Sequence, residues 1–261
     1  MPDYTDDIRL AHMMADNADS LTMDRFKATD LKVSSKPDMT EVTDADVAVE
    51  EVIRKTLARA RPRDAVHGEE MADTGHGPRR WVIDPIDGTR NFVRGVPVWA
   101  TLIALMDGDE VVVGVVSAPA LSRRWWASKG SGAYTGKSLM QATRINVSDV
   151  SAVADASLSY SSLGGWVAGG NGQQFVDLMR TCWRTRAYGD FWSYMLVAEG
   201  AVDIACEPDL ALHDMAACVP IVNEAGGRFT SVEGFEGPVG PGALATNGKL
   251  HDDVVSRLKP V

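Results

Sequence analysis

Cysteine is scarce in this sequence, and its placement excludes two classes of site. The three cysteines are Cys182, Cys206 and Cys218, and no two have the C-x-x-C spacing typical of zinc or redox sites. A disulfide framework needs a denser, paired set of cysteines. We therefore expect a reduced protein in the cytoplasm.

Excess basic charge and long apolar runs are lacking too. The chain has 26 Lys and Arg against 36 Asp and Glu, a formal net charge of −10. That balance argues against a nucleic-acid-binding surface. No apolar run approaches the roughly 20 residues of a membrane helix. The first residues, including Asp3, Asp6 and Asp7, are acidic where a signal peptide would be basic and then apolar. We expect neither a nucleic acid nor a membrane as partner.

Apolar residues make up 45% of the chain, which is enough for a globular core. In the first half, apolar spacing predicts helices over residues 5–26 and from residue 42 to Pro62. Asp107-Gly108 is a strong hairpin signal between predicted strands at 98–106 and 111–117. This half therefore has the pattern of an α+β fold.

In the second half, predicted strands alternate with predicted helices. Strands are expected near residues 156–160 and 202–206, with helices near 173–184 and 190–199 and a glycine-rich loop before the first helix. Such alternation favours α/β layering. We expect an α/β protein with two parts, an α+β half over 1–145 and an α/β half over 146–261.

The most informative stretch follows the apolar run at residues 81–83. Two carboxylates, Asp84 and Asp87, follow the run and lie in a predicted turn that contains Pro85 and Gly88. Because proline has no N–H to donate, we expect the strand to end at Pro85. Two acids at the end of a buried strand are costly unless a cation neutralises them. Mg²⁺ prefers such carboxylate oxygens, with a backbone carbonyl and waters completing its shell.

Residues 88–91 directly follow these acids and have the pattern of a helix start. The free N–H groups of a helix start favour an anion. Metal carboxylates beside such a position suggest metal-assisted phosphoryl chemistry. The alternative is an ordinary turn, because Asp, Pro and Gly favour turns anyway. The isolated motif is compatible with both.

Asp46 also has two interpretations. It stands three residues after Thr43, which is capping-box spacing at the start of the predicted second helix. From these two residues alone, capping is the preferred role.

Taken together, the motifs resemble those of the inositol monophosphatase-like, metal-dependent phosphatases, in the same order and along almost the whole chain. The segments that carry the resemblance are 42–46, 68–70, 84–92, 189–190, 214–217 and 224–227. The resemblance implies an αβαβα layered sandwich, commonly a homodimer, that acts on a small phosphorylated substrate.

The resemblance also implies roles for individual residues. The positions that match metal ligands, for two or three Mg²⁺ ions, are Glu69, Asp84, Asp87, Asp214 and the carbonyl of Ile86. Asp46 and Thr89 match the pair that orients the attacking water, which gives Asp46 a role besides capping. The remaining matches are Gly88 and Thr89 for the phosphate, Glu207 for the alcohol portion, and Glu70 beside the metal ligands.

One position departs from the family pattern. The family usually has tryptophan before the last metal-binding aspartate, where this chain has His213. We interpret it as a packing substitution, with an imidazole that contacts the substrate as the alternative. Trp166, in the glycine-rich loop, is likewise interpreted as packing.

Within the family, the chain is most similar to the histidinol-phosphate phosphatases of bacteria and plants, through residues 92–105 and 188–194. Histidinol phosphate carries an amine and an imidazole, so an added carboxylate at Asp190 would attract it. Asp190 could also cap the helix that follows Gly189, and the two roles are compatible. We therefore predict hydrolysis of histidinol phosphate to histidinol and phosphate, a step of histidine biosynthesis.

Three other functions share part of this sequence pattern. An inositol-1-monophosphatase or a broad sugar or polyol monophosphatase would use the same chemistry with another pocket. An inert relative would lack a carboxylate, whereas all five acids are present. A nucleotide or bisphosphate phosphatase would need a basic patch, which the charge of −10 does not support.

Overall fold

The computed structural model describes residues 3–37 and 39–259. Its α-helices are α1 (Thr5–Arg25), α2 (Asp44–Ala60), α3 (Thr89–Val93), α4 (Leu163–Ala168), α5 (Gly172–Thr181), α6 (Asp190–Ala198), α7 (Leu212–Ala216), α8 (Cys218–Glu224) and α9 (His251–Leu258). Short 3₁₀ turns lie at η1 (Pro119–Leu121) and η2 (Val153–Asp155). Its strands are β1 (Val33–Ser35), β2 (Glu41–Thr43), β3 (Ala65–Gly68), β4 (Arg79–Asp87), β5 (Ala100–Asp107), β6 (Glu110–Ala118), β7 (Arg123–Ser128), β8 (Gly132–Ser138), β9 (Gln141–Ile145), β10 (Ser157–Ser159), β11 (Arg184–Arg186), β12 (Ile204–Glu207), β13 (Arg228–Thr230) and β14 (Ala243–Thr246).

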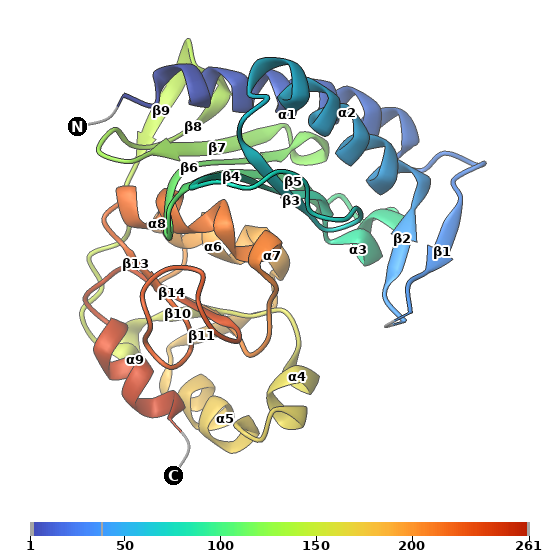
Figure 1. The fold of residues 1–261 in the computed structure, drawn as a ribbon. Helices are drawn as coiled ribbons and strands as arrows, with labels where there is room; N and C mark the ends of the chain where they lie inside the picture. The colour runs from blue at the N-terminus through green and yellow to red at the C-terminus, as the bar shows by residue number, and fades with distance from the viewer. Residues whose placement is uncertain (1–2, 38, 260–261) are drawn as a thin grey trace.

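The elements form five layers, as Figure 1 shows from top to bottom: α1 and α2, a seven-stranded sheet, α6 to α8, a five-stranded sheet, and α4, α5 and α9. Separate apolar clusters fill the spaces between these layers. The predicted αβαβα sandwich is therefore confirmed. Among the described residues, no helix combines the length and the apolar character that crossing a membrane requires.

The first sheet runs β3 to β9 in chain order, and its pairs are antiparallel except β3 with β4. Helices cover both faces, so successive side chains must be buried on opposite sides. In β7, Trp125 packs toward α6 and α8, whereas Trp126 packs toward α1 and α2. Burial on both faces explains why β5 and β6 appear in the sequence as nearly continuous apolar runs, whereas β9 is mostly exposed and polar.

The second sheet has the order β11-β10-β12-β14-β13. Its first three strands are parallel to one another, and β14 and β13 are antiparallel additions. Helices connect the parallel strands, as the alternating pattern predicted. The expected α/β character of the second half is confirmed, while the division into parts at residues 145 and 146 stays a prediction.

One local expectation was wrong. The segment predicted as a glycine-rich loop contains α4, and Trp166 within it is fully buried. Its ring stacks on Phe175 of α5, with centroids 4.4 Å apart and planes 1° from parallel. The packing of Trp166 stabilises this helix, although Gly164 and Gly165 have a low helix propensity.

Candidate active site

Two carboxylates of one strand meet a third that lies more than a hundred residues later in the sequence. Ligand atoms of Asp84 and Asp87, on β4, and of Asp214, in the first turn of α7, lie within 4.8 Å of one another. The helix α7 packs against β4, and this contact brings Asp214 to the strand that carries the other two acids. The predicted convergence of these three acids is therefore found in the structure.

A β-bulge brings Asp84 and Asp87 to the same place. In a regular strand, residues three apart point to opposite faces. Here Asp84 pairs with Leu102 and Asp87 with Ala100, so β4 has one extra residue at this point. The prediction that the strand ends at Pro85 was wrong. The bulge needs no N–H from Pro85, and Thr101 Oγ1 donates a hydrogen bond to its carbonyl at 2.8 Å.

The three acids repel one another in a poorly solvated place. Burial, and after it the charge of Glu69, raises the pKa of Asp84 well above its usual range. Burial, followed by the charge of Asp190, does the same to the pKa of Asp87. Burial also raises the pKa of Asp214, against a lowering effect of His213. The protein thus holds these carboxylates together at an electrostatic cost.

The donor set fits a hard divalent cation. Asp84 is 1% exposed, and its Oδ1 atom is buried without a hydrogen-bond partner among the described residues. Buried polar atoms are rarely left unpaired in a folded protein. All three side chains offer oxygen, which is the ligand that Mg²⁺ prefers. A bound cation would satisfy the unpaired oxygen and offset the repulsion.

Glu69 and Glu70 follow β3 and share one basic partner. Lys36 Nζ lies 2.6 Å from Glu69 Oε1 and 2.7 Å from Glu70 Oε1. Burial is the main cause that raises the pKa of Glu70 to about 7. Glu69 is close enough to raise the pKa of Asp84, so it belongs to the same acidic cluster. Lys36, between β1 and β2, was not predicted.

Glu50 was also missed, although it shapes the turn that carries Glu69. This fully buried side chain of α2 accepts hydrogen bonds from the backbone N–H of Glu70 at 2.8 Å and of Met71 at 3.2 Å. Arg54 pairs with it at 2.7 Å. A Cβ atom at Gly68 would lie 2.1 Å from its Oε1 atom, so a larger residue there would displace the Glu50 carboxylate. A glutamate on a helix's apolar face, four residues before an arginine, was the available signal.

Asp46 caps α2, as its spacing predicted, and it also contacts Thr89, while its role toward the attacking water stays a prediction. Its Oδ2 atom accepts from the backbone N–H and the hydroxyl of Thr43, at 2.8 and 2.6 Å, which completes the capping box of α2. Its Oδ1 atom accepts from Thr89 Oγ1 at 3.3 Å, and this hydroxyl lies 2.9 Å from the Ile86 carbonyl. Burial raises the pKa of Asp46 to about 6. The two carboxylate oxygens of Asp46 thus have different partners: Oδ2 binds Thr43, and Oδ1 binds Thr89.

Asp190 does not cap α6, so that interpretation was wrong. Gly189 is the residue before the helix, and the side chain of Asp190 accepts no N–H of its first turn. Instead, the Phe191 N–H donates to Asp87 Oδ2 at 2.7 Å. Burial, and then the charge of Asp214, raises the pKa of Asp190 to about 6. The backbone at the start of α6 therefore binds Asp87, a member of the acidic cluster, directly.

Glu207 lies at the end of β12 and is 5% exposed. Its two oxygens accept hydrogen bonds from the hydroxyl of Tyr194, at 3.0 Å, and from the hydroxyl of Ser161. Burial is the main cause that raises its pKa to about 7. Ser161 stands between this carboxylate and the open space of the site, and the sequence had not indicated it.

A cavity of about 460 Å³ opens over these residues. It is bordered by Gly88 and Thr89 of the predicted phosphate turn, by Glu69, and by Asp190 and Ser161. Gly88 has a φ of +86°, a left-handed conformation that glycine adopts without strain. The cavity therefore joins the acidic cluster to the residues predicted to contact the substrate.

His213 lies beside the acidic cluster. Its Nε2 atom is 3.8 Å from Asp214 Oδ1, and its ring stacks against His67 with centroids 6.1 Å apart. Among the described residues its buried Nδ1 atom has no hydrogen-bond partner. The packing interpretation matches this position, and His213 does not border the cavity.

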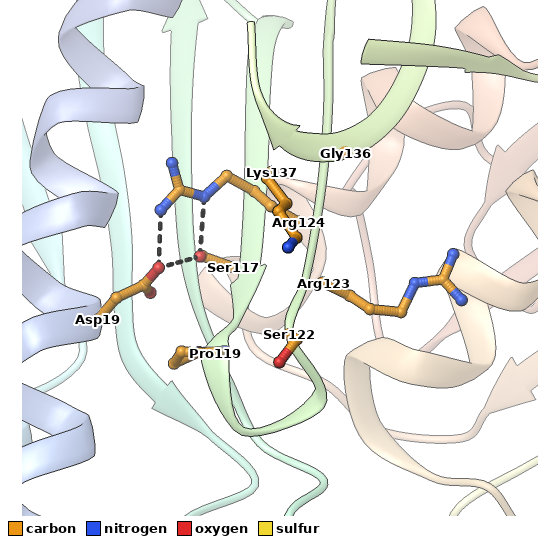
Figure 2. Close-up of a pocket in the computed structure, with 8 residues that line it drawn as sticks. All are labelled: Asp19, Ser117, Pro119, Ser122, Arg123, Arg124, Gly136 and Lys137. Carbon is orange, nitrogen blue, oxygen red and sulfur yellow. Dashed lines mark hydrogen bonds and ion pairs between the residues drawn. The ribbon is translucent and has the colours of Figure 1, made fainter. Parts of the chain in front are cut away.

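A second hollow, of about 300 Å³, lies between α1 and β7 and differs in chemistry (Figure 2). Arg124 points toward Asp19 and Ser117, while Arg123 points the opposite way. Arg124 lies 2.7 Å from Asp19 and 2.8 Å from Asp16, and Arg123 pairs with Glu199 of the helix layer below. With one carboxylate among its lining residues, this hollow offers no site for a divalent cation.

Comparisons with known proteins agree with the geometry. The model of the Inositol monophosphatase family matches residues 3–259. A histidinol-phosphatase of Streptomyces coelicolor is 63% identical over 99% of this chain and 98% of that protein. A histidinol-phosphatase of Mycobacterium tuberculosis is 56% identical over 97% of this chain and 98% of that protein. The solved structure of an IMPase of Thermotoga maritima has a TM-score of 0.86 at 29% identity and covers 97% of both chains.

Proposed function

The chain belongs to the inositol monophosphatase family, and on that premise we propose that it hydrolyses histidinol phosphate to histidinol and inorganic phosphate. The observation that carries this function is identity of 63% and 56% to two histidinol-phosphatases over nearly their whole length. The acidic cluster beside a cavity provides the corresponding site. The enzyme is a phosphoric monoester hydrolase of histidine biosynthesis.

The cofactor we propose is Mg²⁺, two or three ions per site. The residues that would hold it are Glu69, Asp84, Asp87, Asp214 and the carbonyl of Ile86. When bound, Mg²⁺ supplies positive charge that draws the phosphate oxygens and makes water a better nucleophile at neutral pH. The unpaired Asp84 Oδ1 atom and the mutual repulsion of the acids support this assignment.

Asp46 and Thr89 are proposed to place the attacking water. The Thr89 hydroxyl, between Asp46 Oδ1 and the Ile86 carbonyl, lies where it can orient a water on the phosphorus. As the new P–O bond forms, Asp46 can take the proton of the water, since its pKa of about 6 suits a general base. Gly88 and Thr89 hold the phosphate while its bond to the alcohol oxygen breaks and that oxygen takes a proton from solvent water.

The alcohol portion is proposed to bind between Asp190 and the pair of Ser161 and Glu207. A protonated amine on the substrate would be attracted by the Asp190 carboxylate at the cavity wall. Ser161, held by Glu207, presents a hydroxyl to the same space. Glu70 is proposed to act on the metal ligands only through Lys36 and water.

The alternative is an inositol-1-monophosphatase or a broad polyol monophosphatase. The Ser161 and Glu207 pair is compatible with it, because a hydroxyl hydrogen-bonds to a neutral alcohol as well as to an amine. The metal cluster and the phosphate turn would act identically on such a substrate. The charge of the alcohol portion therefore separates the two functions.

A phosphate-release panel tests the proposal. The full chain is assayed with Mg²⁺ on histidinol phosphate, inositol 1-phosphate and a nucleotide monophosphate, with Asp87→Asn as the inactive control. We expect kcat/KM to be at least about tenfold higher for histidinol phosphate, as one charge-assisted contact allows. Equal values for histidinol phosphate and inositol 1-phosphate would reject the proposed substrate.

Two further expectations from the sequence stay predictions: a homodimer and a cytoplasmic location. Sedimentation of the purified chain and fractionation of cells would test them.

A further inference from the structure

Asn91 connects the phosphate turn to the carboxylate expected to select the substrate. It lies in α3, and its Nδ2 atom donates hydrogen bonds to the Val98 carbonyl at 2.9 Å and to Asp190 Oδ2 at 3.0 Å. The amide nitrogen has two hydrogens, so both are used. The Val98 carbonyl can only accept, and this fixes which end of the Asn91 amide faces Asp190.

Asp190 needs such a tether because its backbone conformation is unfavourable. It has a φ of +51° and follows Gly189 at +82°. Left-handed φ values are uncommon for residues other than glycine and persist where their surroundings hold them. Two contacts hold this segment: the Phe191 N–H bond to Asp87 and the Asn91 bond to Asp190.

The same tether decides which oxygen of Asp190 remains available. Asp190 Oδ2 faces Asn91 and also lies close to Gly88, where a Cβ atom would be 3.3 Å from it. Asp190 Oδ1 has no hydrogen-bond partner among the described residues, and Asp190 lines the cavity. One oxygen is therefore used for positioning, and the other can receive a donor from the substrate.

We propose that Asn91 is a positioning residue for substrate selection, which holds the Asp190 carboxylate in place to receive the cationic alcohol portion of the phosphate ester. This inference rests on the proposed function, because it assumes a substrate with a protonated amine. Without the Asn91 amide, the Asp190 side chain could turn away from the cavity. Rotation would weaken binding of the cation and leave the phosphate chemistry intact.

The test is a double-mutant cycle with two substrates. Wild type, Asn91→Ala, Asp190→Ala and the double variant are assayed with saturating Mg²⁺ on histidinol phosphate and on inositol 1-phosphate. Asn91→Ala should raise KM for histidinol phosphate roughly five- to tenfold, as expected for one lost charge-assisted hydrogen bond. Its kcat and its KM for inositol 1-phosphate should stay within about twofold. Asn17→Ala, at an exposed position of α1, is the matched control.

Coupling decides the outcome. If Asn91 acts through Asp190, adding Asn91→Ala to Asp190→Ala should change KM for histidinol phosphate no further. Full additivity, or an equal loss on both substrates, would overturn the inference and assign Asn91 to the turn alone. If the wild-type enzyme shows no preference for histidinol phosphate, the proposed function is rejected, and this inference with it. A preference lost in Asp190→Ala but kept in Asn91→Ala would reject this inference only.

Discussion

The acidic cluster and the hollow of Figure 2 are both groups of charged side chains where a helix meets the first sheet, yet they differ in charge balance. In the hollow, Arg124 pairs with both Asp16 and Asp19, and Arg123 and Lys137 add positive charge to its lining, so the carboxylates there have basic partners. In the acidic cluster, neither Asp84 nor Asp87 has a basic partner among the described residues. A balanced group needs nothing further, whereas an unbalanced one implies a ligand of opposite charge.

The largest effect is expected when one carboxylate of the acidic cluster is replaced. Asp87→Asn should lower kcat on the order of a thousandfold, because it removes a carboxylate from the metal set. The asparagine oxygen can still accept the Phe191 N–H, so the fold should remain. Steady-state kinetics and circular dichroism measure the two properties. Turnover within tenfold of wild type would reject the metal assignment.

The corresponding change in the hollow should act on stability. Arg124→Met leaves the Asp19 carboxylate with the Ser117 hydroxyl but without its basic partner, and should lower the free energy of unfolding by about 3–5 kcal/mol. Urea unfolding measures this change, and kcat of the folded enzyme should stay near that of wild type. Arg9→Met is the control, because its exposed pair with Asp6 should contribute at most about 1 kcal/mol. Similar losses in both variants would contradict the comparison.

Mg²⁺ should distinguish the two regions directly. A ligand that binds only the folded state stabilises it by about 2.7 kcal/mol at a hundred times its Kd. Wild type and Arg124→Met should both gain this increment, and Asp87→Asn should gain little. Thermal unfolding with and without Mg²⁺ measures it. An unchanged increment in Asp87→Asn would show that Mg²⁺ binds elsewhere.

The smallest expected effect is a pH dependence beside the hollow, where His12 Nδ1 lies 3.3 Å from Arg124 Nη1. Burial, followed by the charge of Arg124, lowers the pKa of His12 from 6.5 to about 4. The unfolded chain therefore binds this proton first, and stability present above pH 6.5 is lost as the pH falls toward 4. We expect His12 to account for about 1–2 kcal/mol of that loss after allowance for solvent screening.

His12→Gln should flatten this part of the stability profile measured by urea unfolding at several pH values. His251, whose pKa burial also lowers to about 4, should keep its own contribution in that variant. A profile unchanged by His12→Gln would contradict the assignment.

The site residues that the sequence indicated and those that it missed differ in how far along the chain their partners lie. Asp84, Asp87 and Asp46 stand in short motifs whose chemistry is local, so their residue types and spacing were informative. Glu50 was missed because its partners, the N–H groups of Glu70 and Met71, lie 20 and 21 residues away. The expected cap at Asp190 failed for the same reason, since its carboxylate is held by a residue 99 positions away.

The sequence by itself determined the layered α/β class, through apolar periodicity, and the set of acids, through motifs whose order resembles one family. Only the tertiary structure decided that a bulge at Pro85 puts Asp84 and Asp87 on one side. It also decided that Asp190 turns toward Asn91 and that Glu50 supports the turn of Glu69. Periodicity and motif chemistry depend on neighbours along the chain. The direction of a buried carboxylate depends on partners that folding brings from far away.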